Sequence, residues 1–340
     1  MIRNGDVIEK AHRIDTIVLD KTGTLTQGSP EVTKTMPRHG IPEEDLLCLA
    51  SSVEIGSEHL IGRAIVRAAS KRKLKLIEAT DFLSVPGLGV GATVEGRVVR
   101  VGSFTFLKNA GMSVTREATG LDETTEVGQT RVFISVDNEY FGAFMIADPV
   151  RVGSREVISR LKHADVKVLM LTGDHEITAN AVAEKVGIAE VRARMLPSDK
   201  VEHVLRLQES GHVVAMVGDG TNDAAALSQA DVGIAMGDAS DVALESADVV
   251  LVSNSLKGIS ELRDISRLAV ANVRQNLFGA FIYNVLGIPI AAGVFYPIFG
   301  ILLSPMIAGA AMAFSSLTVV TNANRLHSSI ENSLKSQWSG

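Results

Sequence analysis

The sequence has 340 residues, of which 46% are hydrophobic and 21% are charged, and this is enough for two or three domains with folded cores. Its formal net charge of −6 leaves no basic excess for neutralising phosphates, so the composition argues against nucleic acid as a partner. The single cysteine, Cys48, excludes a disulfide framework and is typical of a reducing compartment.

The first predicted element is a short buried strand at residues 14–19, an apolar run that ends at Asp20. The polar motif "DKTGTLT" (20–26) begins at that residue. Taken alone, this motif is also compatible with an ordinary turn, because Asp, Thr and Gly are common turn residues. Its meaning therefore depends on what the chain places at the ends of its other strands.

The pattern changes between Gln27 and Ala147. Helical stretches at 43–54 and 60–72 precede two glycine-punctuated segments, 83–103 and 130–146, that are typical of antiparallel strands. We interpret this region as an α+β domain inserted at 28–145. The first domain then comprises residues 1–27 and 146–260.

Strands resume after the insertion and again end in polar motifs. The run "VKVLML" (166–171) leads into "TGD" (172–174), and "VVAMV" (213–217) leads into "GDGTND" (218–223). Helical patterns at 151–163, 175–187 and 198–210 alternate with these strands, which predicts an α/β fold with a doubly wound parallel sheet. In such a sheet, groups at the carboxyl ends of the strands converge on one crevice.

The converging residues suit phosphoryl transfer. The carboxylate of Asp20 can act as a covalent nucleophile toward a phosphoryl group, and Asp219 and Asp223 offer oxygen ligands to Mg²⁺. Thr172 could hold phosphoryl oxygens, and Lys200 in "PSDK" could supply a fixed positive charge. The alternative is that each loop is only a turn, but three polar loops at three strand ends favour a site.

The C-terminal part carries no Asp, Glu, Lys or Arg from Gln275 to Asn324. Two apolar runs within it are each long enough to cross a bilayer, which needs roughly 20 residues. We expect a linker helix at 261–276, transmembrane helices at 277–296 and 298–321, and a polar tail at 322–340. The alternative is a pair of buried helices in a large soluble core.

Charges beside these runs predict the orientation. Arg263, Arg267 and Arg274 precede the first run and Arg325 follows the second, whereas the turn between the runs is uncharged. Because cytoplasmic flanks carry the excess of Lys and Arg, we expect a two-span membrane protein whose soluble domains and termini are cytoplasmic.

The order and spacing of "DKTGTLT", "TGD", "PSDK" and "GDGTNDAAAL" resemble the P-type ATPases, which are cation pumps of the haloacid dehalogenase superfamily. The resemblance extends from about residue 5 to residue 326. It implies that Asp20 becomes an aspartyl-phosphate and that Thr172 and Lys200 contact the phosphoryl group. The implied catalytic set is Asp20, Lys21, Thr22, Thr172, Gly173, Asp174 and Lys200, and the implied Mg²⁺ site is Asp20, Thr22, Asp219 and Asp223.

Thr22 distinguishes this chain from phosphatases of the same superfamily. Those enzymes usually have an acid at the second position after the nucleophile, and a threonine cannot activate water as a carboxylate does. We therefore predict a comparatively long-lived phosphoenzyme.

The inserted region carries "GSEHLIGRAI" (56–65) and "PGLGVG" (86–91), which look like the "SEHP" and "GxGxxG" nucleotide-binding motifs of the heavy-metal subgroup. The resemblance implies contacts of ATP with Glu58, His59, Gly87 and Gly89, where glycine permits close backbone approach. Helix-start chemistry, with Ser57 as N-cap, is the alternative. Leu60 stands where the family usually has proline, which puts the affinity for nucleotide in question.

Polar groups in the predicted spans point to the transported ion. Tyr283 and Asn284 lie in the first span, and Met312 and Ser316 share a helix face in the second. A thioether is a soft ligand that suits Cu(I), although Asn and Ser also join helices and Met also fills space. The pattern "YN" followed by "MxxSS" resembles the copper(I)-exporting subgroup, whereas zinc-type pumps have a lysine and an aspartate here.

The resemblance as a whole implies an ATP-driven copper(I) pump that uses ATP and Mg²⁺. The chain looks like the C-terminal half of such a pump, because neither a Cys-Pro-Cys motif nor the "TGE" of an actuator domain occurs in it. We expect it alone to bind ATP and phosphorylate itself at most, with the missing N-terminal half as a partner. The alternatives are a membrane-tethered phosphohydrolase and a non-catalytic nucleotide-binding regulatory subunit.

Overall fold

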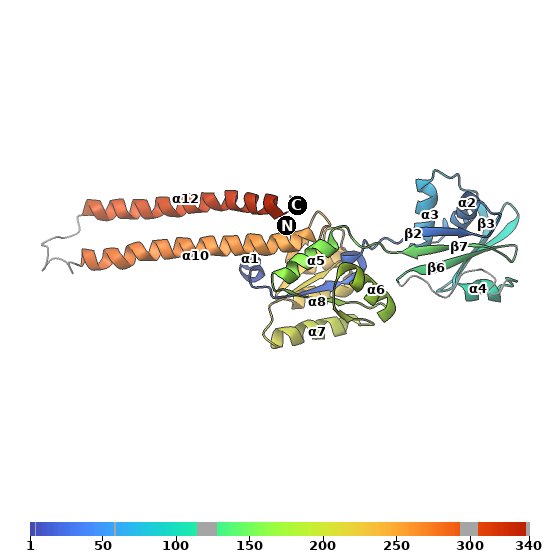
Figure 1. Cartoon of the computed structure of the whole chain (residues 1–340), viewed down its shortest axis with the longest axis horizontal. Coiled ribbons are helices and arrows are strands. Elements are labelled where there is room, and N and C mark those ends of the chain that lie inside the picture. Colours follow the sequence, from blue (N-terminus) through green and yellow to red (C-terminus); the bar gives the residue numbers. More distant parts are fainter. Residues whose placement is uncertain (4, 58, 114–127, 293–304, 338–340) are drawn as a thin grey trace.

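The computed structural model describes residues 1–3, 5–57, 59–113, 128–292 and 305–337. Figure 1 shows a parallel sheet with its helices at the centre, an antiparallel sheet with its helices at one end and two long helices at the other. The chain leaves the parallel sheet after its first strand and returns to it after completing the antiparallel sheet. The predicted insertion of an α+β region into the α/β region is thus confirmed.

In the described residues the parallel sheet has six strands in the order β12-β11-β10-β1-β8-β9. These strands are β1 (Thr16–Asp20), β8 (Lys167–Leu171), β9 (Glu190–Arg192), β10 (Val214–Gly218), β11 (Val232–Met236) and β12 (Val249–Leu251). The three strands predicted near 14–19, 166–171 and 213–217 are confirmed. The prediction missed β9, β11 and β12, two of which have only three residues.

Helices cover both faces of this sheet. They are α1 (Asp6–Ala11), α5 (Ser154–His163), α6 (Glu176–Val186), α7 (Pro197–Glu209), α8 (Ala224–Gln229) and α9 (Asp241–Ser246). Ile17 and Leu19 of β1 pack into the core formed with α5 and α6, and Val18 packs into the core formed with α7 and α8. Because both faces are buried, β1 reads as a continuous apolar run rather than an alternating one.

The inserted region is an antiparallel sheet in the order β2-β7-β6-β5-β4-β3. Its strands are β2 (Glu31–Pro37), β3 (Ala79–Val85), β4 (Gly89–Val94), β5 (Arg97–Gly102), β6 (Thr130–Val136) and β7 (Glu139–Ala147). Helices α2 (Glu43–Glu54) and α3 (Leu60–Lys71) bury an apolar core against it, and α4 (Phe104–Asn109) packs in a separate cluster with Phe133. The helices predicted at 43–54 and 60–72 are confirmed.

The two connections between the sheets are bound to each other. Thr26 pairs with Val150 in an isolated antiparallel bridge. The carboxylate of Asp148 accepts hydrogen bonds from the hydroxyl of Thr26 and from the backbone N–H groups of Gly28 and Ser29, the latter two at 3.1 and 3.2 Å. The two connections are therefore hydrogen-bonded to each other and do not run as separate linkers.

The last two helices, α10 (Lys257–Ala291) and α12 (Pro305–Gln337), lie side by side (Figure 1). The side-chain amide of Asn322 donates to Asn276 at 2.8 Å, and that of Asn272 donates to the Asn322 carbonyl at 2.9 Å. Among the residues that the structure describes, no helix is long and apolar enough to cross a membrane. The predicted spans include residues 293–304, which lie outside the described residues, and they stay a prediction. Residues 322–337, predicted as a polar tail, continue α12.

Candidate active site

The site lies where three neighbouring strands of the parallel sheet end. β1 lies between β8 and β10, and its last residue, Asp20, is level with Leu171 at the end of β8. After β1 the chain first adds β8 and β9 on one side of it. It then adds β10, β11 and β12 on the other side. Such a switch point leaves a crevice at the carboxyl ends of the strands. The sequence motifs predicted to converge therefore meet at one place.

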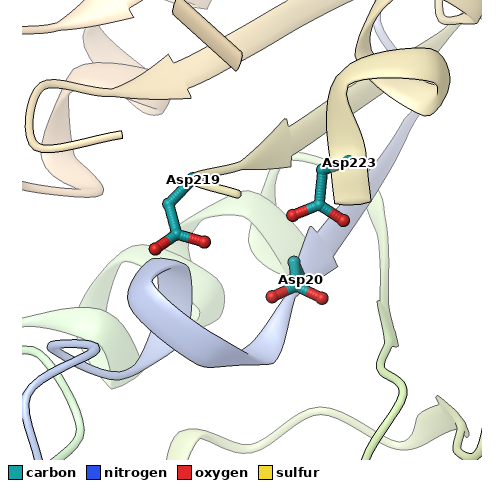
Figure 2. A group of neighbouring side chains, drawn as sticks. All are labelled: Asp20, Asp219 and Asp223. Carbon is teal, nitrogen blue, oxygen red and sulfur yellow. The ribbon is translucent and has the colours of Figure 1, made fainter. Parts of the chain in front are cut away.

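Three carboxylates face one another in this crevice. Figure 2 shows Asp20 at the end of β1, Asp219 after β10, and Asp223 at the end of the short helix that leads into α8. One oxygen from each lies within 4.8 Å of the other two. This oxygen-only set is the type of ligand that Mg²⁺ prefers, so the described residues fit that ion.

Burial and mutual repulsion raise the pKa of two members of this cluster, Asp20 and Asp219. Burial, followed by the charge of Asp223, raises the pKa of Asp20 to about 7, although Lys200 opposes the shift. The same two causes, burial first, raise the pKa of Asp219 to about 6. A cation placed among the oxygens would favour the ionised forms of Asp20 and Asp219.

Lys200 supplies the positive charge inside the cluster. Its Nζ lies 2.6 Å from Oδ1 of Asp20 and 2.6 Å from Oδ1 of Asp223. Burial alone would lower the pKa of Lys200, but the two carboxylates outweigh that effect and raise it. Lys200 lies in the first turn of α7, where Asp199 accepts a hydrogen bond from the Leu196 N–H at 2.9 Å and fixes the start of the helix. The lysine is thus a buried, positioned cation.

Asp174 organises the other side of the crevice. It forms an ion pair with Lys21 and accepts hydrogen bonds from the hydroxyls of Thr172 at 3.0 Å and Thr22 at 3.4 Å. Burial alone would raise the pKa of Asp174, but the hydrogen bond and charge of Lys21 outweigh it and lower the pKa. Gly173 lies in this turn, where the Asp174 N–H donates to the Thr172 hydroxyl. Lys21 therefore neutralises Asp174, and Lys200 neutralises Asp20.

Gly23 lets the loop after β1 pass close to the carboxylates. Its φ is +70°, and a Cβ built on it would lie 1.5 Å from Oδ2 of Asp219. The guanidinium of Arg151 holds this loop by donating to the carbonyls of Gly23 and Thr26, and it also pairs with Asp238 at 3.1 Å. Sequence reasoning missed this role of Arg151, because the segment that follows the insertion was interpreted only as the return to the first domain.

The predicted nucleotide residues lie in the inserted region, and one of them, Glu58, is outside the described residues. The Nδ1 of His59 accepts from the Ile61 N–H at 3.2 Å, so His59 is the N-cap of α3. Leu60 is the first residue of that helix, a position that tolerates proline but does not require it. The departure at Leu60 therefore leaves the start of the helix intact.

The two predicted glycines flank the turn between β3 and β4, and they differ. Gly87 has a φ of +72° with open space where a Cβ would be. A Cβ on Gly89 would lie 2.4 Å from the Val101 carbonyl and 2.6 Å from the ring of Phe106, so packing inside the sheet already requires glycine there. Only Gly87 offers a backbone that is open to a ligand.

A buried carboxyl group in the same region was missed by sequence reasoning. Glu54, at the end of α2, is only 6% exposed, and burial raises its pKa to about 7 although a hydrogen bond with Ser57 opposes the shift. A Cβ on Gly62 of α3 would lie 2.3 Å from its Oε2. Glu54 thus lies against α3 beneath the loop that carries His59, and its place in a helical pattern gave no sign of burial.

The structure does not bring the predicted copper residues together in any described contact. Tyr283 and Asn284 are on α10, and Met312 and Ser316 are on α12. The side chains of Tyr283, Asn284 and Met312 lie outside the described residues, and Ser316 is exposed. Their grouping stays a prediction.

Comparisons with known proteins agree with this geometry. Residues 14–231 match the family of haloacid dehalogenase-like hydrolases. The chain is 44% identical over 328 residues to a silver exporting P-type ATPase of Salmonella typhimurium, covering 96% of this chain and 40% of that protein. It is also 44% identical to a copper-exporting P-type ATPase of Vibrio cholerae, of which it covers 36%.

A solved structure shares the fold. A zinc-transporting PIB-type ATPase in its E2.Pi state superposes with a TM-score of 0.79 at 34% identity, covering 96% of this chain and 52% of that one. The chain thus spans about half of this neighbour's length. It spans 40% and 36% of the lengths of the two relatives above.

Proposed function

Since the chain belongs to the haloacid dehalogenase-like hydrolases and, within them, to the P-type ATPases, we propose that Asp20 accepts the γ-phosphoryl group of ATP. The observation that carries this proposal is the placement of Asp20 within 4.8 Å of two further carboxylates and 2.6 Å from Lys200. Such a constellation joins a nucleophile to the positive charge that phosphoryl transfer requires.

Each residue has a distinct part in the proposed step. An oxygen of Asp20 forms the new bond to phosphorus, while the bond between the γ-phosphorus and its bridging oxygen breaks and ADP leaves with that electron pair. Lys200 favours the ionised nucleophile and offsets charge on the transferred group. Thr172 is buried just after the neighbouring strand, and its hydroxyl, which donates to Asp174 in this structure, would have to turn from that carboxylate to donate to a phosphoryl oxygen. Mg²⁺ held by Asp20, Asp219 and Asp223 would supply charge neutralisation, whereas Thr22, whose hydroxyl donates to Asp174 in this structure, stays a predicted ligand.

Thr22 favours a phosphoenzyme that persists. Its hydroxyl donates to Asp174, which is itself paired with Lys21. In this part of the site Asp174 is engaged in three interactions, and the position after Lys21 holds an alcohol instead of a carboxylate. Water is then poorly activated, as a pumping cycle would require.

We propose that the nucleotide binds to the inserted region at the loop before α3 and the β3–β4 turn. His59 and Gly87 are accessible there, and Glu58, which precedes His59 in the sequence, lies outside the described residues. Gly89 has a structural reason to be glycine and is the weakest member of the predicted set. The junction at Asp148 then connects the nucleotide region to the phosphorylated loop.

Copper(I) is the ion that we propose as cargo. The relatives above are named for silver and copper export, and a soft thioether such as Met312 suits monovalent ions of that kind. The proposed ligands stay Tyr283, Asn284, Met312 and Ser316. The fold neighbour is named for zinc, so the choice rests on the sequence relatives and the charge-free stretch.

The same stretch supports a membrane location. Exposed apolar side chains lie along α10, among them Phe278, Phe281 and Ile288, each at least 65% exposed. We propose that α10 and α12 cross the bilayer with both soluble regions on the cytoplasmic side. Transport would also need the segments that the relatives carry outside the matched region. These segments would be supplied by a partner protein or by the same polypeptide.

Labelling with ATP tests this function. Full-length chain in detergent, given γ-labelled ATP and Mg²⁺, is expected to take up an acid-stable, hydroxylamine-sensitive label that Asp20→Asn abolishes. Turnover of small phosphate esters without such an intermediate would favour the membrane-tethered phosphohydrolase instead. ATP binding with neither label nor turnover would favour the regulatory subunit.

A growth assay tests the proposed need for further segments. In cells that lack copper export, this chain alone is expected not to restore growth on copper. Restoration by the chain alone would refute that part of the proposal.

A further inference from the structure

A groove of about 440 Å³ lies between the two long helices, α10 and α12. Both helices contribute polar and apolar residues to its lining, among them Gln275, Gly279, Phe314, Leu317, Asn322 and Arg325. A cavity that combines apolar surface with a few polar groups is typical of a binding site for a small amphipathic molecule.

Side-chain amides hold the helices together at the polar part of this groove. The Asn322 amide donates to Asn276 at 2.8 Å and to the carbonyl oxygen of Gln275 at 3.4 Å. No described residue accepts a hydrogen bond from the N–H groups of Gln275. The groove is therefore bounded by a fixed pair of helices, and Gln275 keeps donors for a ligand.

Arg325 gives the polar part a positive charge. It is exposed, and it is the one charged residue among the described residues that line the groove. Its guanidinium has no ion-pair partner within the described ranges, and no Asp or Glu occurs between Gln275 and Asn324. Since a guanidinium binds phosphate through paired hydrogen bonds, this charge favours an anionic phosphate group.

The apolar part leaves room for a hydrocarbon chain. Phe314 and Leu317 are 64% and 60% exposed, and a Cβ built on Gly279 would meet no atom within 4 Å. The hydroxyl of Thr318, which also lines the groove, donates to the Phe314 carbonyl one turn earlier at 2.8 Å. That hydroxyl is satisfied within its own helix, so it does not require a polar ligand.

The groove crosses the boundary of the predicted spans, 277–296 and 298–321. Gln275, Asn322 and Arg325 lie just outside these ranges, whereas Gly279, Phe314 and Leu317 lie inside them. A polar and cationic end at the membrane surface, continuous with an apolar end inside the bilayer, matches the two parts of a phospholipid.

We propose that this groove binds one anionic phospholipid, with the phosphate at Arg325 and an acyl chain along Phe314 and Leu317. The inference rests on the proposed membrane location of α10 and α12. Another protein helix could fill the apolar part, but it would have to bring a carboxylate to the bilayer boundary to pair with Arg325. The unpaired charge therefore favours the lipid.

Native mass spectrometry of the full, delipidated chain in detergent tests the apolar part. Phosphatidylglycerol is the probe, and Gly279→Leu is expected to lower its binding several-fold because leucine occupies the groove. Gly287→Leu is the matched control, since it is on the same helix, also has no atom within 4 Å of its Cβ and lies outside the groove. Equal binding by both variants and the wild type would overturn the lipid site and leave the groove to a protein helix.

A second pair of variants tests the charge. Arg325→Gln is expected to weaken phosphatidylglycerol binding by about fivefold and to leave phosphatidylcholine binding unchanged. Arg267→Gln, an exposed arginine of α10 outside the groove, should bind as the wild type does. Equal loss in the two arginine variants would contradict the site. Alkaline extraction of cell membranes reports the location separately, so a chain that stays in the membrane but fails these tests loses the lipid site alone.

Discussion

At the scale of single residues, the chemistry of the site depends on how two lysines are divided between carboxylates. Both follow from the sequence motifs, but their partners do not: Lys200 reaches across 180 residues to Asp20, whereas Lys21, the neighbour of Asp20, pairs with Asp174. Proximity in sequence would have assigned Lys21 to the nucleophile. The motifs predicted which residues meet, and tertiary packing decided which charges pair.

Gly23 offers a residue-scale prediction. Gly23→Ala is expected to lower phosphorylation by about 100-fold or more, because its Cβ would lie 1.5 Å from the Asp219 carboxylate at a φ of +70°. The label from γ-labelled ATP measures this. Gly96→Ala is the matched control, with a φ of +75° but open space around its Cβ, so it carries the backbone strain alone. Equal loss in both variants would mean that strain, and not the clash with Asp219, is responsible.

Glu54 predicts a pH-dependent stability. Its pKa is raised from 4.5 to about 7 in the folded state, so ionisation costs stability. The stability that the neutral Glu54 carboxyl allows is complete below about pH 4.5. It is lost as the pH rises through about 7, the pKa of this group in the folded state. The melting temperature of Glu54→Gln minus that of the wild type should therefore increase by roughly 3 °C or more between about pH 5 and pH 8. A difference that does not change with pH would show that the carboxyl is not buried as described.

At the scale of elements, the junction between the two sheets follows from one carboxylate and one guanidinium. Asp148 binds the outgoing connection, and Arg151, three residues later, binds the loop after β1 and the carbonyl of Asn254 just before α10. The strands and helices themselves were predictable from periodicity. This junction was not, because its bonds join the Asp148 and Arg151 side chains to backbone groups, which carry no sequence signal.

Removing the carboxylate should loosen the junction. Asp148→Ala leaves the N–H groups of Gly28 and Ser29 without their acceptor, so protease cleavage near residues 27–30 is expected to accelerate several-fold. Limited proteolysis followed by mass spectrometry of the fragments measures it. Glu78→Ala, an exposed acid elsewhere in the inserted region, should be cleaved like the wild type. Unchanged cleavage in Asp148→Ala would show that the backbone bridge at Thr26 suffices.

At the scale of the whole molecule, the α/β class and the insertion were predictable because buried strands and polar loop motifs alternate along the chain. The short strands β9 and β12 were not, since three residues carry too little pattern. The membrane assignment rests on the charge-free composition and on the exposed apolar side chains of α10, and the predicted turn between the spans falls in residues 293–304. The proposed copper ligands Tyr283, Asn284 and Met312 stay a prediction, because their side chains lie outside the described residues.

Membrane extraction tests the proposed location for the whole chain. In cells, the full chain is expected to stay with the membrane pellet after alkaline carbonate treatment. Val285→Lys combined with Ile288→Lys, at two exposed apolar positions of α10, should release a large fraction, because charges in a span are costly. Release of the unaltered chain by carbonate would contradict the two-span proposal.

The central claim is that Asp20 itself carries the phosphoryl group, and chemical mapping of the site tests it most directly. The full chain is incubated with MgATP, quenched in acid, reduced with borohydride and digested, and the peptide containing "DKTGTLT" is analysed by mass spectrometry. An aspartyl-phosphate at position 20 predicts a homoserine there, absent when ATP is omitted. An unmodified Asp20 in protein that has bound MgATP, or modification at another carboxylate, would contradict the account.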